Sequence, residues 1–263
     1  MDFHALWPFV ASLRRSRCTA AVALCIRDID AQTSELLSRA GVALVTIRDE
    51  DPLAGVQVNS LRYFVYRQFV RGLPAEVDRI LITDVRDVVF QRDPFAHVFE
   101  DGLHCFLEDG RKSLSTCEYN ANWLGVAYGE EALRQLGSLP IACSGTTLGS
   151  RTAIEAYLDA MTAGIEVISE RTPGITQVLH PVDQAVHNYV VRLGLPATPA
   201  FHTNEDGPVL TLYHVPPDEV LIDAEGNVRN RAGDMPSVLH QYDRHPRLVT
   251  WVNDRFGVRA ECP

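Results

Sequence analysis

Short apolar runs alternate with amphipathic helical stretches in the first third of the chain, and this alternation constrains the fold more than any other feature. The runs lie at residues 20–26, 41–47 and 81–83 and are rich in Val, Ile, Leu and Ala, as buried strands are. Between them, apolar side chains recur at the spacing of a helix face. Strands that alternate with helices predict an α/β fold around a parallel sheet. Ligands of such a sheet bind beyond the carboxyl ends of its strands.

Periodicity and turn residues predict further elements along the chain. We expect helices at residues 31–40, 151–163 and 182–193, a helix whose apolar face carries Phe3, Leu6, Val10 and Leu13, and a helix capped by Asn59. We expect strands at residues 103–107 and 141–148, then strands and turns from residue 209 to 242, with a hairpin turn at 225–227. No repeat, linker or low-complexity tract marks a boundary, so residues 1–263 are expected to form a single domain.

Composition narrows the classes of function and partner. The formal net charge is -10 and no basic run is longer than the pair Arg14-Arg15, so no nucleic-acid partner is expected. The six cysteines include no C-x-x-C spacing and lie in mostly apolar surroundings, which suits reduced thiols in a cytoplasmic enzyme. No apolar run reaches the roughly 18 to 20 residues of a membrane span, and the N-terminus lacks the order of a signal peptide. A peripheral association with a membrane stays open.

The stretch ILITDVRDVVFQRDPF, residues 80–95, runs an apolar strand directly into Asp84 and Asp87. A dry and unpaired carboxylate at the edge of a core costs several kcal/mol, so it needs solvent, a hydrogen bond or a cation. Carboxylate oxygens suit a hard divalent ion such as Mg²⁺ or Mn²⁺, which keeps positions open for phosphate. The plainer interpretation is that the two aspartates cap the following turn or helix and pair with Arg86 or Arg92.

The whole stretch resembles the metal-binding strand and loop of nucleotide-sugar-dependent glycosyltransferases of the GT-A fold. In that family an apolar strand ends in a D-x-D motif, followed by a second apolar run, an acidic residue and a Pro or small residue. Asp87 takes the place of the motif's metal-ligating last Asp, whereas Asp84 lies three positions earlier instead of two. The resemblance implies that Asp84 contacts the ion, directly or through water, or the ribose. It also implies that Val85 and Arg86 belong to the donor-binding loop.

Two further segments resemble the family's donor-binding parts. Residues 59–63 are similar to the helix that precedes the D-x-D strand, and by this resemblance Arg62 faces the donor diphosphate. Residues 142–149, ACSGTTLG, are similar to the N-S-G-V segment that lines the donor-sugar pocket. Ser144 and Gly145 stand at the matching places, and Cys143 replaces the usual Asn. Plainer interpretations are a solvated helix-face arginine and a turn glycine.

Two later segments complete the resemblance. Residues 180–185, HPVDQA, are similar to the D-Q helix start, which implies that Asp183 and Gln184 face the donor sugar and the acceptor. Residues 238–246, VLHQYDRHP, resemble the late histidine segment of several GT-A families, in which one His completes the metal site. We assign that role to His240. The plainer interpretations are that Asp183 caps the helix and that His240 is a hydrogen-bonded residue of a strand.

Taken together, the resemblance runs in order from Phe3 to Pro246 and implies a GT-A, nucleotide-diphospho-sugar transferase-like domain, a three-layer α/β/α sandwich around a mostly parallel sheet. The expected activity is hexosyltransferase-like. A sugar moves from a UDP- or GDP-sugar to a hydroxyl of a glycan or small-molecule acceptor, with Mn²⁺ or Mg²⁺ as cofactor. The late histidine favours a retaining reaction, in which Asp183 or Gln184 stabilises the positively charged sugar. In an inverting reaction Asp183 would deprotonate the acceptor.

Two other classes of function remain. A nucleotidyltransferase shares the architecture and the metal, but it usually carries a Gly-rich basic loop after its first strand, and nothing similar occurs near this N-terminus. A non-catalytic relative would bind nucleotide without turnover.

The start of the chain raises a separate question. A GT-A chain opens with a central strand that grips the base, whereas here the helix face starts at Phe3 and leaves no room for that strand. Its loss would leave unpaired backbone groups in the core. Met1 is then an internal start of a longer natural chain, or another segment fills the slot, or the fold is a shortened variant. We favour the first explanation.

Overall fold

The computed structural model describes residues 2–47, 57–97, 99–172, 174–175 and 182–257, and these residues form a mixed α/β fold. The chain divides into two compact units. Unit 1 comprises Met1–Ile47, Thr83–Phe99 and His202–Pro263, and unit 2 comprises Arg48–Ile82 and Glu100–Phe201. The expectation of a single domain stays a prediction. Among the described residues, no helix combines the length and the apolar character needed to cross a membrane.

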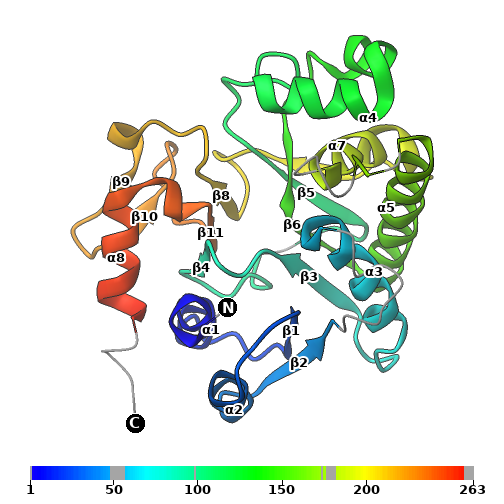
Figure 1. Cartoon of the computed structure of the whole chain (residues 1–263). Helices are drawn as coiled ribbons and strands as arrows, with labels where there is room; N and C mark the ends of the chain where they lie inside the picture. The colour runs from blue at the N-terminus through cyan, green and yellow to red at the C-terminus, as the bar shows by residue number, and fades with distance from the viewer. Residues whose placement is uncertain (1, 48–56, 98, 173, 176–181, 258–263) are drawn as a thin grey trace. The chain divides into compact units, whose positions relative to one another are not determined.

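Unit 1 begins with the predicted alternation of helix and strand (Figure 1). Its first elements are α1 (Phe3–Arg15), β1 (Val22–Ile26), α2 (Ala31–Arg39) and β2 (Val42–Thr46). The carboxylates of Asp2 and Asp30 cap the two helices, each accepting a backbone N–H three residues later. β1 and β2 pair in parallel, as expected for strands joined by a helix.

A three-stranded sheet and a C-terminal helix complete unit 1. The sheet has the order β4-β11-β8, and β11 runs antiparallel to β4 and parallel to β8. The predicted hairpin turn is confirmed, with Gly226 at φ 78° between β9 and β10. Leu210, Leu239 and Leu248 belong to the core between this sheet and α8. The elements are β4 (Val88–Phe90), β8 (Val209–Thr211), a 3₁₀ helix (Pro217–Glu219), β9 (Leu221–Ile222), β10 (Val228–Arg229), β11 (Val238–His240), a 3₁₀ helix (Tyr242–Arg244) and α8 (Pro246–Phe256).

Unit 2 is built around a sheet with the order β3-β6-β5-β7. Helices α3, α5 and α7 pack together, and their apolar side chains form one core with those of β5 and β6. Figure 1 shows α5 and α7 beside β6. The elements are α3 (Val58–Arg71), β3 (Arg79–Thr83), β5 (Leu103–Leu107), α4 (Glu118–Leu136), β6 (Ala142–Ser150), α5 (Arg151–Arg171), α7 (Val182–Tyr189), a π-helix (Val190–Gly194) and β7 (Ala200–His202).

The sheets are small and mixed, which differs from the mostly parallel sheet expected from the sequence. β5 and β6 pair antiparallel although a helix, α4, joins them. Figure 1 shows why: α4 lies beyond the ends of the two strands and does not cross the face of the sheet. The chain segments that enter and leave α4 remain paired, because Leu114 donates to the carbonyl of Leu139 and Ser115 to that of Gly137. The connection is a long hairpin.

The start of α3 corrects one local prediction. The helix begins at Val58 after Gln57, and no side chain caps it, so Asn59 is an internal residue. A second difference concerns the helix expected at residues 182–193, which is α-helical only to Tyr189 and continues as a π-helix. Both differences concern helix ends, where several neighbouring polar residues can fit a sequence pattern equally well.

Candidate functional site

The pairing of β4 with β11 in unit 1 brings two of the predicted metal ligands together. His240 is the last residue of β11, and it lies opposite Val88, the residue that follows Asp87. The ladder continues beyond His240, because the N–H of Gln241 donates to the carbonyl of Asp87 at 2.8 Å. Gln241 adopts the left-handed φ of 61° to make this bond. Strand register therefore sets where the imidazole and the carboxylate stand.

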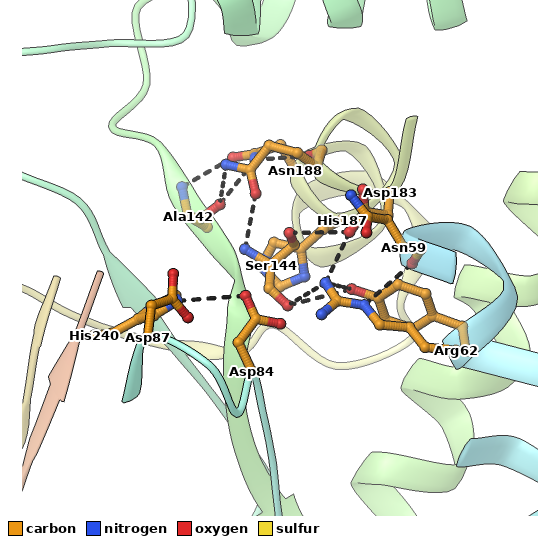
Figure 2. Close-up of polar contacts among 12 residues, drawn as sticks. Asn59, Arg62, Asp84, Asp87, Ala142, Ser144, Asp183, His187, Asn188 and His240 are labelled. Carbon is orange, nitrogen blue, oxygen red and sulfur yellow. Dashed lines mark hydrogen bonds and ion pairs between the residues drawn. The ribbon is translucent and has the colours of Figure 1, made fainter. Parts of the chain in front are cut away.

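Asp84, Asp87 and His240 form a compact set of possible metal ligands, which Figure 2 shows. Nε2 of His240 lies 3.5 Å from Oδ2 of Asp84 and 4.0 Å from Oδ1 of Asp87, and one ligand atom from each residue lies within 4.8 Å of the others. Ligands about 2.1 Å from an octahedral cation lie about 3 Å apart when adjacent and about 4 Å apart when opposite. His240 and Asp87 are buried and Asp84 is half-buried. The spacing fits a divalent cation that is reached from the Asp84 side.

The charges around Asp87 favour a bound cation. Burial raises the pKa of the Asp87 carboxyl, His240 opposes this rise, and the charges of Asp84 and Asp243 add to it. The pKa of the nearby Tyr242 hydroxyl is raised to about 12, by burial first and then by Asp87 and Asp243. The Asp87 carboxylate thus lies in the field of two further carboxylates. A divalent cation would relieve their mutual repulsion.

The chemistry of the three ligand groups indicates which ion this set fits. Two carboxylates and one imidazole nitrogen suit Mn²⁺ somewhat better than Mg²⁺, which prefers oxygen ligands alone. Two polar atoms beside His240, Oε1 of Gln241 and Oγ1 of Thr211, are buried and have no hydrogen-bond partner within the described part of the chain. Buried polar atoms normally have a partner, so a hydrated ion or ordered water at this place would satisfy them. The residues therefore fit a hydrated divalent ion.

Arg62 and Asp183 form the centre of a second polar cluster, in unit 2. Nη2 of Arg62 donates to Oδ2 of Asp183 at 2.8 Å, and both side chains are largely buried. Ser144 adjoins this pair: its hydroxyl donates to the same Oδ2 at 3.4 Å, and its carbonyl accepts from the Tyr63 hydroxyl at 3.2 Å. Arg62 is therefore not a solvated helix-face residue. Asp183 lies inside α7, as its second residue.

Two amide side chains of α7 hold the backbone of β6 beside this cluster. Gln184 accepts from the N–H of Ser144 at 2.8 Å and donates to the carbonyl of Ala142 at 3.1 Å. Asn188 accepts from the N–H of Ala142 and donates to its carbonyl, both at 2.9 Å. The β5–β6 register shifts between the pair Leu107–Ala142 and the pair Cys105–Thr147, so β6 is irregular from Ala142 to Thr147. The amides of α7 take the place of strand partners.

Gln184 and His187 of α7 make further contacts with other side chains of unit 2. Nε2 of Gln184 lies 3.4 Å from both Oε1 of Glu108 and Oδ1 of Asn120. Nδ1 of His187 forms a hydrogen bond of 2.8 Å with the Tyr157 hydroxyl. Burial lowers the pKa of His187 to about 3, helped by the charges of Arg192 and Arg62, so the ring is neutral at pH 7.

The structure groups the sequence-predicted residues into two sets. Asp84, Asp87 and His240 meet in unit 1, and Arg62, Ser144 and Asp183 meet in unit 2 (Figure 2). Gln184 joins the second set through its bond to Ser144. Gly145 lies in the irregular part of β6, Val85 is half-buried, and Arg86 is exposed, with its carbonyl accepting from Tyr242. His180 and Pro181 of the predicted D-Q segment lie outside the described residues.

Sequence reasoning missed Tyr63, Asn188 and Asp243. Asn188 follows Gln184 by four residues, so both amides lie on one face of a helix, and this spacing was available as a signal. Asp243 follows His240 by three residues within the quoted histidine segment. Nothing in the sequence distinguishes Tyr63 from an ordinary core tyrosine.

Comparison with known proteins adds no assignment. No protein-family model matches this chain, and no curated protein matches it in a sequence search. The case for a function therefore depends on the residues and their geometry.

Proposed function

We propose that this chain is a divalent-metal-dependent glycosyltransferase of the GT-A fold, which moves a hexose from a UDP- or GDP-sugar to a hydroxyl of a glycan or small molecule. The observation that carries the proposal is the Asp84, Asp87 and His240 set, whose ligand atoms lie within 4.8 Å of one another. Asp87 belongs to the stretch that resembles the family's metal-binding strand, and His240 to the segment that resembles its late histidine segment.

The set in unit 1 is assigned to the diphosphate. When bound, a divalent cation would supply positive charge to the diphosphate leaving group. Asp84 and Asp87 supply carboxylate ligands, and His240 supplies an imidazole nitrogen. Arg244 adds a cation on the same unit: its Nε lies 3.6 Å from Oδ1 of Asp243, and its guanidinium lies 5.5 Å above the centre of the partly exposed Tyr213 ring. An anionic donor would be attracted to this otherwise acidic chain by such local charge.

The cluster in unit 2 is assigned to the sugar. In a retaining reaction the anomeric C–O bond to the diphosphate breaks, the acceptor oxygen bonds to the same face of the sugar, and the acceptor proton passes to the leaving phosphate. Asp183 would stabilise the positive charge that develops on the sugar. Arg62 holds that carboxylate in place, and Gln184 supports the reaction by holding Ser144 on β6.

Release of nucleoside diphosphate from a panel of UDP- and GDP-sugars, with Mn²⁺ and a mixture of simple glycan acceptors, tests the proposal. We expect release from at least one donor, and loss of this activity in Asp183→Ala mainly through kcat. Arg62→Ala should lower kcat and raise KM. Binding of the diphosphate without release from any donor would favour a non-catalytic relative. Formation of a nucleotide sugar and pyrophosphate from a nucleoside triphosphate and a sugar phosphate would indicate a nucleotidyltransferase.

A further inference from the structure

The buried side chain of Asn204 lies at the outer edge of the strand that pairs with His240. Its amide bonds twice to one residue: the N–H of Thr211 donates to Oδ1 at 2.8 Å, and Nδ2 donates to the carbonyl of Thr211 at 2.9 Å. β8 is the edge strand of the order β4-β11-β8, so its outer backbone groups have no strand partner in this sheet. One amide therefore replaces a missing strand at Thr211.

Thr211 is the residue of β8 that lies beside His240. The parallel register pairs the two residues, and the N–H of Leu212 donates to the carbonyl of His240 at 3.0 Å. On its other side His240 lies opposite Val88, directly after Asp87. A shift of β8 at Thr211 would therefore change the position of His240 relative to Asp87.

We infer that Asn204 is a positioning residue for the candidate metal centre. By fixing β8 at Thr211, it holds the His240 imidazole at the distances from Asp84 and Asp87 that a divalent cation requires. This inference rests on the proposed function, in which these three residues bind the cation. Loss of an outer support typically weakens metal affinity about 10- to 100-fold, because the ligands lose their fixed geometry.

Gln91 provides a matched control in the same unit. Its Oε1 accepts from the N–H of Val228 at 2.8 Å, and its Nε2 donates to the carbonyl of Val228 at 3.0 Å. Gln91 follows Phe90, so it lies at the opposite end of β4 from Asp87. Gln91→Ala removes the same kind of amide clamp, but away from the metal set.

Binding of Mn²⁺ to the full chain, without nucleotide, tests the inference. The electron paramagnetic resonance signal of free aquated Mn²⁺ gives the Kd, and circular dichroism at the same temperature establishes that each variant is folded. We expect Asn204→Ala to raise the Kd about tenfold or more. Asn204→Ser, whose hydroxyl can make one of the two bonds, should fall between Asn204→Ala and the wild type. Gln91→Ala should bind Mn²⁺ like the wild type.

A folded Asn204→Ala with the wild-type Kd would overturn the inference and leave the proposed function standing. If Asn204→Ala does not fold, the Kd of Asn204→Ser tests the inference, because its smaller polar side chain retains part of the clamp. A Kd above that of the wild type supports the inference, and the wild-type Kd overturns it. Equal weakening by Gln91→Ala would also overturn the inference, because the effect would then reflect general destabilisation of unit 1. A wild-type chain that binds no Mn²⁺ would overturn both the inference and the proposed function.

Discussion

Arg62 and Asp183 form a buried ion pair with an Nη2–Oδ2 distance of 2.8 Å, and their side chains are 15% and 2% exposed. Removal of one partner would leave the other charge desolvated, which typically costs about 3 to 5 kcal/mol of unfolding free energy. We expect Asp183→Ala and Arg62→Ala each to destabilise the chain by several kcal/mol. The double variant should lose less than the sum of the two, because it leaves no uncompensated charge. Urea unfolding of the four proteins measures this coupling.

The pair Arg71 and Asp159 provides the matched control. It has a similar N–O distance, 2.7 Å, and it also lies in unit 2, but its side chains are 56% and 48% exposed. Solvent screens such a pair, and its coupling should be about 1 kcal/mol or less. Equal coupling energies in the two pairs would contradict the buried character of the Arg62–Asp183 contact.

The amide of Asn188 is expected to stabilise the irregular part of β6. Asn188→Ala leaves the buried N–H of Ala142 without its partner, which typically costs about 1 to 3 kcal/mol of unfolding free energy, whereas the carbonyl of Ala142 keeps its bond from Gln184. Hydrogen exchange of the Ala142 amide should become faster in this variant. Asn122→Ala, at an exposed position of α4, is the control. It should change neither the unfolding free energy nor the exchange rate of the Ala142 amide appreciably. Unchanged exchange at Ala142 in Asn188→Ala would show that another group satisfies this N–H.

His187 is expected to make the fold sensitive to acid. Its pKa in the folded chain is about 3, below the unfolded value of about 6.5, so the unfolded chain binds the proton more tightly. The stabilisation is therefore fully present above about pH 6.5 and is lost as the pH falls toward 3. In His187→Asn, whose amide can still bond the Tyr157 hydroxyl, the unfolding free energy should decline less between pH 7 and pH 4. A decline as steep as in the wild type would assign the acid sensitivity to other groups.

Asp87→Asn is expected to remove metal binding while the fold is kept. The amide has nearly the same shape, but it lacks the charge that attracts the ion. Without metal this variant should be as stable as the wild type or more stable, since burial already penalises the Asp87 carboxylate. Asp254→Asn, an exposed change on α8 of the same unit, serves as the control for surface charge. Mn²⁺ binding measured by calorimetry should be lost only in Asp87→Asn, and a wild-type Kd there would refute the ligand assignment.

The sequence predicts the elements of this fold well where an apolar period is long. The faces of α1 and α5 and the strands β1, β2, β3 and β5 follow directly from the spacing of apolar residues. The pairing of the strands could not be predicted from this spacing, because it depends on where the segments that connect the strands pack. α4, which was not predicted from the sequence, extends beyond β5 and β6, and the two strands pair antiparallel instead of joining a mostly parallel sheet. No local pattern within residues 118–136 encodes that choice.

The candidate site was predictable as a set of residue types and only partly as a set of contacts. Asp87 and His240 follow from their segments, and the register of β4 and β11 brings them together. The backbone partners of Asn204 and Asn188 could not be identified in this way, because no side-chain pattern marks Thr211 or Ala142 as the residue that each amide bonds. Such amides become visible only when the unpaired edge that they occupy is known.

The central claim is that a divalent cation bridges this chain to a nucleoside diphosphate, and the melting temperature measured with and without metal tests it most directly. We predict that UDP or GDP raises the melting temperature only when Mn²⁺ or Mg²⁺ is present. The rise should grow with nucleotide concentration, as expected for a ligand that binds the folded state. Addition of EDTA should return the melting temperature to that of the free chain. An equal rise with and without EDTA, or no rise with any nucleotide and metal together, would contradict the claim.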